Sequence, residues 1–155
     1  EHVHTVGNSP AMCDAGALVL LGDAALGESL GMAPKARLIT SATASGEPLE
    51  VVSGCITVTE APLADQGLHA QDIDLFEIHE AFAATVIKTR QVLGIDDSRL
   101  NVNGGVIALG HPMGATGAIM VGTLIDELLR QRLNTGVVAA SGAAGSGSAL
   151  LLERC

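Results

Sequence analysis

Polar and apolar positions along the chain follow two periods, one typical of strands and one typical of helices. Residues 36–45 alternate polar and apolar side chains, which predicts a strand. Residues 72–79 form a more apolar segment, which predicts a buried strand that ends at His79. The spacing of apolar residues predicts helices at residues 59–68, 80–94 and 114–132.

The segment from Asp14 to Gly31 is apolar on all sides and predicts a further helix, one that is buried. Asp14 stands where a helix begins, and Gly31 stands where a helix commonly ends in the left-handed conformation. On the helix predicted at 114–132, the charged residues expected to face water are Asp126, Glu127, Arg130 and Arg132.

The last segment, residues 135–155, consists of two apolar stretches joined by a turn of Gly, Ala and Ser, which predicts a hairpin. Strands that alternate with helices indicate parallel pairing, whereas a terminal hairpin adds an antiparallel pair. The sequence therefore predicts an α/β fold of three layers, with a mixed sheet between helices and a β-hairpin at the end.

Composition limits the partners of this chain. Its 155 residues suffice for one domain with a sizeable core, and 48% of them are hydrophobic. The formal net charge of -9 and the lack of a Lys/Arg cluster argue against nucleic acid or a membrane surface as partner. A small ligand or another protein fits this charge better, and backbone N–H groups can still bind phosphates.

The three cysteines, Cys13, Cys55 and Cys155, are odd in number and scattered, so they predict no disulfide framework. No CxxC motif or His/Cys pair predicts a metal site. No apolar run reaches membrane-spanning length, so we expect a soluble protein of the cytoplasm or of an organelle matrix. Because the opening EHVHTVGNSP resembles the end of a strand or loop, we expect a fragment or a processed chain.

Three places combine chemically versatile side chains with the end of a predicted strand. Ligands of open α/β sheets bind where strands end and loops begin, so these places hold the candidate functional residues. They are His79 with Glu80, His111 in the glycine-rich loop of residues 103–117, and Ser141 with Gly142.

The glycine-rich loop around His111 has two explanations. The ordinary one is that a backbone carbonyl satisfies the imidazole and that the glycines serve only the turns. The functional one is that close backbone approach, the fixed dihedral of Pro112 and the positive end of the next helix hold one imidazole beside an anion-friendly site. A dinucleotide-binding loop fits less well, because GGVIALGHPMG does not match GxGxxG and the chain has no P-loop lysine.

Four motifs resemble those of the thiolase family, the acyl-CoA acetyltransferases that form or cleave 3-ketoacyl-CoA. NVNGGVIALGHPMGATGA resembles the family's glycine–histidine signature, and HEAFAA resembles its [N/H]-E-A-F segment. TVGNSPAMCDAGALVLL resembles T-A-G-N-[SA]-x-x-x-D-G-A-A-A, and the closing VVAASGAAGSGSALLLE takes the place of C-G-G-G-x-G-x-A. The resemblance implies that residues 1–12 end a preceding region and that residues 13–155 are a thiolase C-terminal domain.

The resemblance also implies a mechanism, in which a cysteine of an N-terminal half, absent from this chain, attacks the acyl group and forms an acyl-enzyme. His111 would take the proton of this nucleophile and help stabilise the oxyanion. His79 would hold a water molecule or donate a hydrogen bond directly in the same oxyanion hole. Glu80 would orient the two histidines. Ser141 stands in the position of the family's second cysteine, which is its acid/base.

Further positions follow from the same resemblance. Gly142 and Ala143 correspond to the backbone of a second oxyanion hole. Coenzyme A and acyl-CoA are expected as substrates, with no bound cofactor, and a homodimer or tetramer is expected because family members form them. The residues expected to contact the substrate are Ala81, Phe82, Gly110 and Pro112, of which Phe82 fits the core equally well.

Departures from the family pattern leave two functions open. A serine hydroxyl is a far weaker acid than a thiol, so Ser141 is expected to slow condensation and thiolysis more than acyl transfer. Ala143 and Ala144 replace glycines, Pro10 stands near a serine that often contacts coenzyme A, and VVSGCIT departs from the usual G-x-G-P stretch. We therefore expect either the C-terminal part of a thiolase-type acyltransferase, inactive by itself, or an impaired module that binds acyl-CoA or serves as a scaffold.

Overall fold

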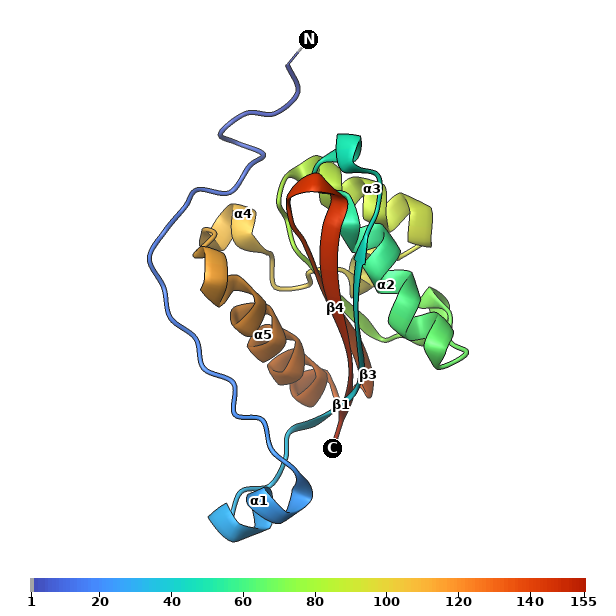
Figure 1. Ribbon diagram of the computed structural model, residues 1–155. Helices are drawn as coiled ribbons and strands as arrows, with labels where there is room; N and C mark the ends of the chain where they lie inside the picture. The colour runs from blue at the N-terminus through green and yellow to red at the C-terminus, as the bar shows by residue number, and fades with distance from the viewer. Residues whose placement is uncertain (1) are drawn as a thin grey trace.

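A mixed sheet of four strands forms the centre of the molecule (Figure 1). The strands lie in the order β1-β4-β3-β2. β2 and β3 run parallel, whereas β4 pairs antiparallel with both β1 and β3, which confirms the predicted mixed sheet. The computed structural model describes residues 2–155, and its strands are β1 (Ala36–Ser45), β2 (Leu75–Ile78), β3 (Thr135–Ser141) and β4 (Ser146–Arg154).

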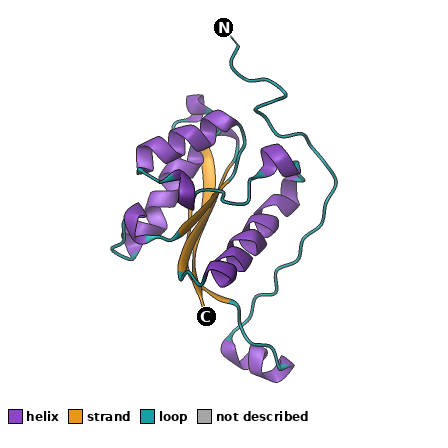
Figure 2. Ribbon diagram, turned by 180° about the vertical axis from the view of Figure 1, so that it is seen from behind, coloured by secondary structure: helices purple, strands orange, loops and turns teal. Residues whose placement is uncertain are grey.

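Helices cover both faces of this sheet, which confirms the three predicted layers (Figures 1 and 2). α2 (Gly54–Asp65) and α3 (Ala83–Leu93) lie on one face, and α5 (Thr116–Gln131) lies on the other. α4 (Val106–Leu109) is a single turn, and α1 (Ala24–Leu30) lies apart from the sheet. No helix within residues 2–155 combines the length and the apolar character needed to cross a membrane.

The period of two along each strand creates two apolar cores, one on each face of the sheet. Phe76 and Ile78 of β2 belong to the core under α2 and α3. Leu75 of the same strand belongs to the core under α5, together with Leu124 and Leu128. Each such buried side chain contributes about 1.5–3 kcal/mol, so both helix layers hold the sheet in place.

β3 and β4 form the predicted terminal hairpin. Their pairing runs from Thr135 opposite Glu153 to Ser141 opposite Gly147. A short 3₁₀ turn, Ala143–Gly145, connects them, and both of its last two residues have positive φ. The hairpin therefore places the end of β3 and the start of β4 side by side.

α5 is the helix predicted at residues 114–132, but one of its charged side chains differs from the prediction. Glu127 is only 4% exposed, so the prediction that it faces water is wrong. Its carboxylate accepts hydrogen bonds from Arg130, Gln131 and Asn103, which lower its pKa to about 2. These bonds replace the water that a buried charge loses.

The prediction of a buried helix from Asp14 to Gly31 is wrong for most of this segment. Only α1 is helical, and it has no buried residue. The residue that caps it is Asp23, whose side chain accepts from the N–H of Leu26 at 2.8 Å. Gly31 ends the helix with φ 63°, as predicted.

Residues 13–22 instead run in an extended course along the outside of the molecule (Figure 1). Leu18 is 95% exposed, and Leu20 and Leu21 are 61% and 71% exposed. Within residues 2–155 no element covers these side chains. A short apolar run fits a buried strand as well as a buried helix, so its pattern does not separate the two. We call residues 2–23 the arm.

Close packing of α2 on β4 depends on two glycines. A Cβ added to Gly54 would lie 2.0 Å from the carbonyl oxygen of Ser146. A Cβ added to Gly147 would lie 2.8 Å from the carbonyl oxygen of Gly54. Interiors are packed too densely to absorb such contacts unless the helix and the strand separate. The contact therefore fixes the first turn of α2 beside the end of β3.

We expect Gly54→Ala to lower the free energy of unfolding by roughly 1–3 kcal/mol, because the added methyl group overlaps backbone atoms. The matched control is Gly122→Ala within α5, where a Cβ meets nothing within 4 Å. It should raise the free energy of unfolding by up to about 1 kcal/mol through helix propensity. Urea unfolding of the three chains measures both effects, and equal effects would contradict the packing described for Gly54.

Candidate active site

The ends of β2 and β3 bring two of the three candidate places together. Because the two strands are parallel neighbours, their carboxyl ends meet at one edge of the sheet. His79 follows β2 directly, and its N–H donates to the carbonyl oxygen of Ala139 at 2.8 Å. Ser141 is the last residue of β3, and its carbonyl oxygen lies 3.2 Å from Nδ1 of His79.

His111 reaches the same place from the glycine-rich loop. Its ring centroid lies 4.6 Å from that of His79. Nδ1 of His111 lies 2.7 Å from Oγ1 of Thr116, the first residue of α5. Its backbone N–H donates to the carbonyl oxygen of Ala11 at 2.8 Å, so the arm holds the loop from the other side. Gly110 has φ 93°, a conformation that favours glycine. All three candidate places thus meet at one site.

The hydrogen-bond partner of His79 decides which ring nitrogen carries the proton. A carbonyl oxygen can only accept, so the contact with Ser141 places the proton on Nδ1. Nε2 is buried and has no hydrogen-bond partner within residues 2–155. Burial and the neighbouring His111 lower the pKa of His79, opposed by the Ser141 carbonyl and by Glu80. The neutral ring therefore offers a lone pair at Nε2, and it donates there only after taking up a second proton.

Glu80 fixes the loop that carries His111. Its Oε2 accepts from the backbone N–H of Ile107 at 2.9 Å, and its Oε1 accepts from Nδ2 of Asn101 at 3.3 Å. Asn101 also accepts from the N–H of Ile78 at 2.7 Å and donates to its carbonyl at 2.9 Å. Asn101 was not predicted as a site residue, and its only signal is an asparagine beside the glycine-rich loop. Through its bond to the N–H of Ile107, Glu80 thus holds the backbone of the glycine-rich loop in place.

The predicted substrate-contacting residues border the arm and the glycine-rich loop. Phe82 directly precedes α3, and its ring centroid lies 4.5 Å from that of His4 in the arm. Ala81 and Pro112 are half-buried. Gly110 lies against the arm, since a Cβ there would lie 2.5 Å from Sγ of Cys13.

The two predicted backbone donors differ in their availability. The N–H of Gly142 already donates to the carbonyl oxygen of Ser146 at 2.8 Å. Ala143 is exposed and has no positive φ, since the left-handed residue is the next one, Ala144, with φ 55°. Of the two, Ala143 is therefore the better placed to donate to a bound oxyanion.

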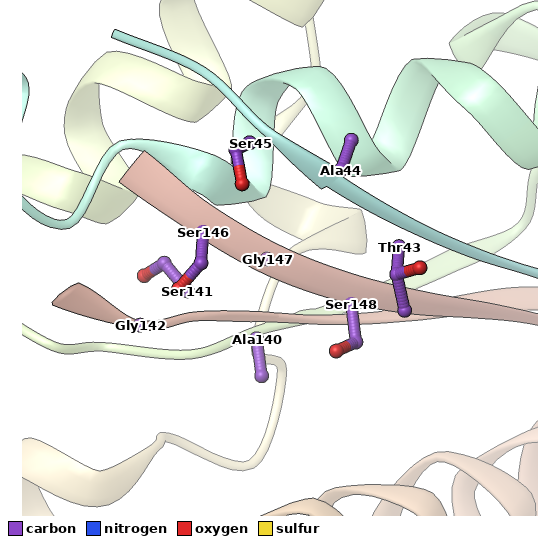
Figure 3. A pocket seen from close by; sticks show the side chains of 9 residues that line it. All are labelled: Thr43, Ala44, Ser45, Ala140, Ser141, Gly142, Ser146, Gly147 and Ser148. Atoms are coloured by element: carbon purple, nitrogen blue, oxygen red, sulfur yellow. The ribbon is translucent and has the colours of Figure 1, made fainter. Parts of the chain in front are cut away.

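An open cleft of about 560 Å³ lies at the Ser141 end of the sheet (Figure 3). It is bordered by small residues of β1, β3 and β4. The hydroxyl group of Ser141 is buried at this cleft and has no hydrogen-bond partner within residues 2–155. The side chains with hydroxyl groups around the cleft are those of Thr43, Ser45, Ser141, Ser146 and Ser148.

The structure pairs none of the three cysteines. Cys13 and Cys155 are exposed, whereas Cys55 is buried. Within residues 2–155 no three side chains of His, Cys, Asp or Glu are grouped to hold a metal ion.

Glu77 is a buried carboxyl group beside the histidines that was not predicted as a site residue. It is 4% exposed and borders a small cavity together with His79 and Glu80. Burial and the charges of Glu80 and Glu127 raise its pKa to about 8. Glu77 is therefore mostly a neutral acid at pH 7.

We expect Glu77→Gln to remove a pH dependence of stability. The unfolded carboxyl titrates near 4.5 and the folded one near about 8, so the folded chain binds an extra proton between these values. This stabilisation is complete below about pH 4.5 and is lost as the pH rises toward about 8. In urea unfolding, the wild type should lose a few kcal/mol relative to the variant between about pH 5 and pH 8. Equal pH dependence of both chains would contradict a neutral, buried Glu77.

Comparison with known proteins identifies the family of this chain. A family model described as thiolase, C-terminal domain, matches residues 32–154. The chain is 41% identical over 152 residues to the 3-ketoacyl-CoA thiolase of Bacillus subtilis, covering 97% of this chain and 39% of that protein. It is 39% identical over 150 residues to the acetyl-CoA acetyltransferase of Pseudomonas aeruginosa, covering 97% of this chain and 38% of that protein.

A solved structure leads to the same family. The fold matches the crystal structure of the Bacillus anthracis acetyl-CoA acetyltransferase with a TM-score of 0.92 and 33% identity, over 97% of this chain and 38% of that chain. The chain thus spans less than two-fifths of the length of these proteins. The boundary predicted between residues 12 and 13 stays a prediction. By its matched domain, its fold and its relatives, the chain belongs to the thiolase family and carries the C-terminal domain of that family.

Proposed function

We propose that this chain supplies the histidine and serine side of a thiolase-type active site, which cleaves or forms 3-ketoacyl-CoA with coenzyme A. The observation that carries the proposal is the pair of His79 and His111, with ring centroids 4.6 Å apart at the strand ends of a thiolase-family domain. The names of the relatives, a 3-ketoacyl-CoA thiolase and an acetyl-CoA acetyltransferase, support this class of reaction. Coenzyme A and acyl-CoA are then substrates, and the reaction is expected to need no bound cofactor.

The nucleophile in this proposal is a cysteine outside residues 1–155, in an N-terminal half such as the longer relatives have. Cys55 is wholly buried, and Cys155 follows the end of β4 that lies away from the site. Cys13 lies in the arm and occupies none of the family's motif cysteine positions. The exposed leucines of the arm support a partner surface that covers them. We call this chain, together with the region that carries the nucleophile, the assembled protein.

In the proposed first step, His111 takes the proton of the nucleophilic thiol, and the thiolate attacks the acyl carbonyl. The contact of Nδ1 with Thr116 orients the ring and leaves Nε2 for this transfer. The His111 imidazolium is proposed to stabilise the thioester oxyanion, and the backbone N–H of Ala143 is proposed to donate in the second oxyanion hole. Ser141, at the open cleft, stands at the place of the second proton transfer.

A second candidate function is an impaired thiolase-like module that binds acyl-CoA or serves as a scaffold. One observation favours it, namely the hydroxyl group of Ser141 in the position of an acid/base thiol. Thiolysis by the assembled protein separates the two functions, because the impaired module would bind acyl-CoA without turnover.

Further properties of the assembled protein rest on resemblance and composition alone. A homodimer or tetramer and a cytoplasmic location remain predictions. The net charge of -9 supports a small-molecule substrate over nucleic acid or a membrane surface as partner.

We expect His111→Ala to lower formation of the acyl-enzyme by at least about 100-fold, because the variant lacks the base that activates the nucleophile. The measurement is transfer of label from radioactive acetyl-CoA to the assembled protein. The control is His69→Ala, which changes an exposed histidine outside the site and should leave labelling intact. Unchanged labelling of His111→Ala would refute the role given to His111.

We expect Ser141→Cys to raise the rate of thiolysis by about tenfold or more, because a thiol exchanges protons near neutrality far better than a hydroxyl group. Labelling by acetyl-CoA should change less than thiolysis, since coenzyme A can leave as the thiolate of a thiol with a pKa of about 8.5, without a proton from Ser141. Ser148→Cys, which changes another hydroxyl residue at the same cleft, is the matched control. An equal or lower rate in Ser141→Cys would show that the serine does not limit turnover.

A further inference from the structure

A loop that departs from the family pattern lies against the turn of the terminal hairpin. β1 ends at Ser45, which pairs with Ser146 at the start of β4 (Figure 3). Residues 46–52 follow, and we call them the clamp loop. The clamp loop ends in the first residues of VVSGCIT, the stretch that lacks the family's G-x-G-P pattern. The proposed function gives this loop no task.

The clamp loop binds both backbone groups of Gly145, the last residue of the turn Ala143–Gly145. The N–H of Gly46 donates to the carbonyl oxygen of Gly145 at 2.8 Å, and the N–H of Gly145 donates to the carbonyl oxygen of Val51 at 2.7 Å. Gly145 is buried with φ 72°, and a Cβ added to it would lie 2.9 Å from the carbonyl oxygen of Glu47. The turn and the clamp loop are therefore in direct backbone contact, with no room for a side chain between them.

Val51 makes its bond to Gly145 in a strained conformation. Its φ of 55° and ψ of -73° place it at the centre of the rare, strained type of γ-turn, which the N–H of Val52 closes on the carbonyl oxygen of Glu50 at 2.7 Å. Positive φ is least favourable for a β-branched side chain such as that of valine. Val51 is 54% exposed, so side-chain packing does not explain the conformation. The bond to Gly145 is the interaction that this conformation makes possible.

The other end of the same turn is held by Ser146. The N–H of Gly142 donates to the carbonyl oxygen of Ser146 at 2.8 Å, and Oγ of Ser146 donates to the carbonyl oxygen of Ala143 at 2.9 Å. The N–H of Ala143 itself has no hydrogen-bond partner within residues 2–155. The turn therefore presents this N–H in a fixed direction, as an oxyanion donor requires.

The turn needs the clamp loop because it is strained as well. Ala144 has φ 55°, a conformation that alanine rarely adopts. If Gly145 were released, Ala144 would relax to negative φ, and this rotation would turn the neighbouring peptide groups. The direction of the Ala143 N–H therefore depends on the bond between Gly145 and Val51.

We propose that Val51 is a positioning residue of the second oxyanion hole. Its γ-turn directs its carbonyl oxygen to the N–H of Gly145, which holds the turn and so directs the N–H of Ala143. This inference rests on the function proposed above and adds to it a residue from the stretch that departs from the family pattern.

The proposal predicts which kinetic constants depend on Val51. Attack on the acyl carbonyl creates an oxyanion when the acyl-enzyme forms, and attack by coenzyme A on the acyl-enzyme creates another. A misdirected donor therefore slows both acyl-enzyme formation and thiolysis. Binding of coenzyme A makes no use of this donor, so kcat falls while KM for coenzyme A stays nearly constant.

The first test changes residue 51 in the assembled protein. Val51→Pro fixes φ near about -65° and turns the carbonyl away from Gly145, so it should lower kcat for thiolysis and the rate of labelling by acetyl-CoA by about 10–10²-fold. KM for coenzyme A should change less than about threefold. Val51→Gly is the conservative variant, because glycine adopts positive φ freely and keeps the carbonyl, and it should recover kcat to within about threefold of the wild type.

The second test breaks the same contact from the turn. Gly145→Ala places a Cβ against Glu47 and should lower kcat by a factor similar to that of Val51→Pro. The double variant should lose less than about threefold more, because both changes remove one contact. The matched control is Gly67→Ala, which has φ 66° and nothing within 4 Å of the added Cβ, and it should lower stability without lowering kcat.

Hydrogen exchange of the Gly145 N–H, followed by NMR, reports the contact itself. Exchange should be slow in the wild type and in Val51→Gly, and faster by about tenfold or more in Val51→Pro. A loss of kcat that accompanies this faster exchange at constant KM supports positioning of the donor.

Several outcomes would overturn the proposal. Fast exchange at Gly145 with a wild-type kcat in Val51→Pro would do so and leave the proposed function standing. Equal losses from Val51→Gly and Val51→Pro, or additive losses in the double variant, would also contradict it. Should Val51→Pro not fold, Gly145→Ala decides against the proposal if its kcat equals that of Gly67→Ala. A wild-type protein that forms no acyl-enzyme would overturn the proposed function and this inference with it.

Discussion

The parallel pairing of β2 with β3 is the constraint on which the site depends. Its register, with Ile78 opposite Ala139, continues into the hydrogen bond from the N–H of His79 to the Ala139 carbonyl. One such bond contributes only about 0.5–1.5 kcal/mol, but a slip of one residue would turn every side chain to the other face. In this register His79 meets the Ser141 carbonyl, which places its ring proton on Nδ1, and Cys55 reaches the same Ala139 oxygen.

The site keeps polar groups buried without full hydrogen bonding. Nε2 of His79 and Oγ of Ser141 have no partner within residues 2–155, and each such group costs about 1–3 kcal/mol. Folding stability alone does not explain this cost. The proposed chemistry at the strand ends would give both atoms a use, as a lone pair beside His111 and as a carrier of a proton. Oγ1 of Thr59 in α2 is also unpartnered, and we have no physical account of it.

The sequence predicts well what local pattern determines and poorly what distant partners determine. The strand at residues 36–45 was predictable, because its alternation follows from one face that packs on a core. The course of residues 13–22 was not, since an apolar run does not reveal what covers it. Glu127 was misplaced because Asn103, far along the chain, helps to hold its charge. Asn101 escaped notice for the same reason. The pattern did predict that His79 and Ser141 lie at strand ends, whereas their part in a reaction stays a prediction.

The central claim is that this chain forms one side of an acyl-transfer site whose nucleophile lies outside it. The most direct test is to treat the assembled protein with acetyl-CoA, quench it in acid and locate the acetyl group by peptide mass spectrometry. We predict a thioester on a cysteine outside residues 1–155, with Cys13, Cys55 and Cys155 unmodified. A thioester on Cys13, beside the glycine-rich loop, or the lack of any thioester would contradict this claim.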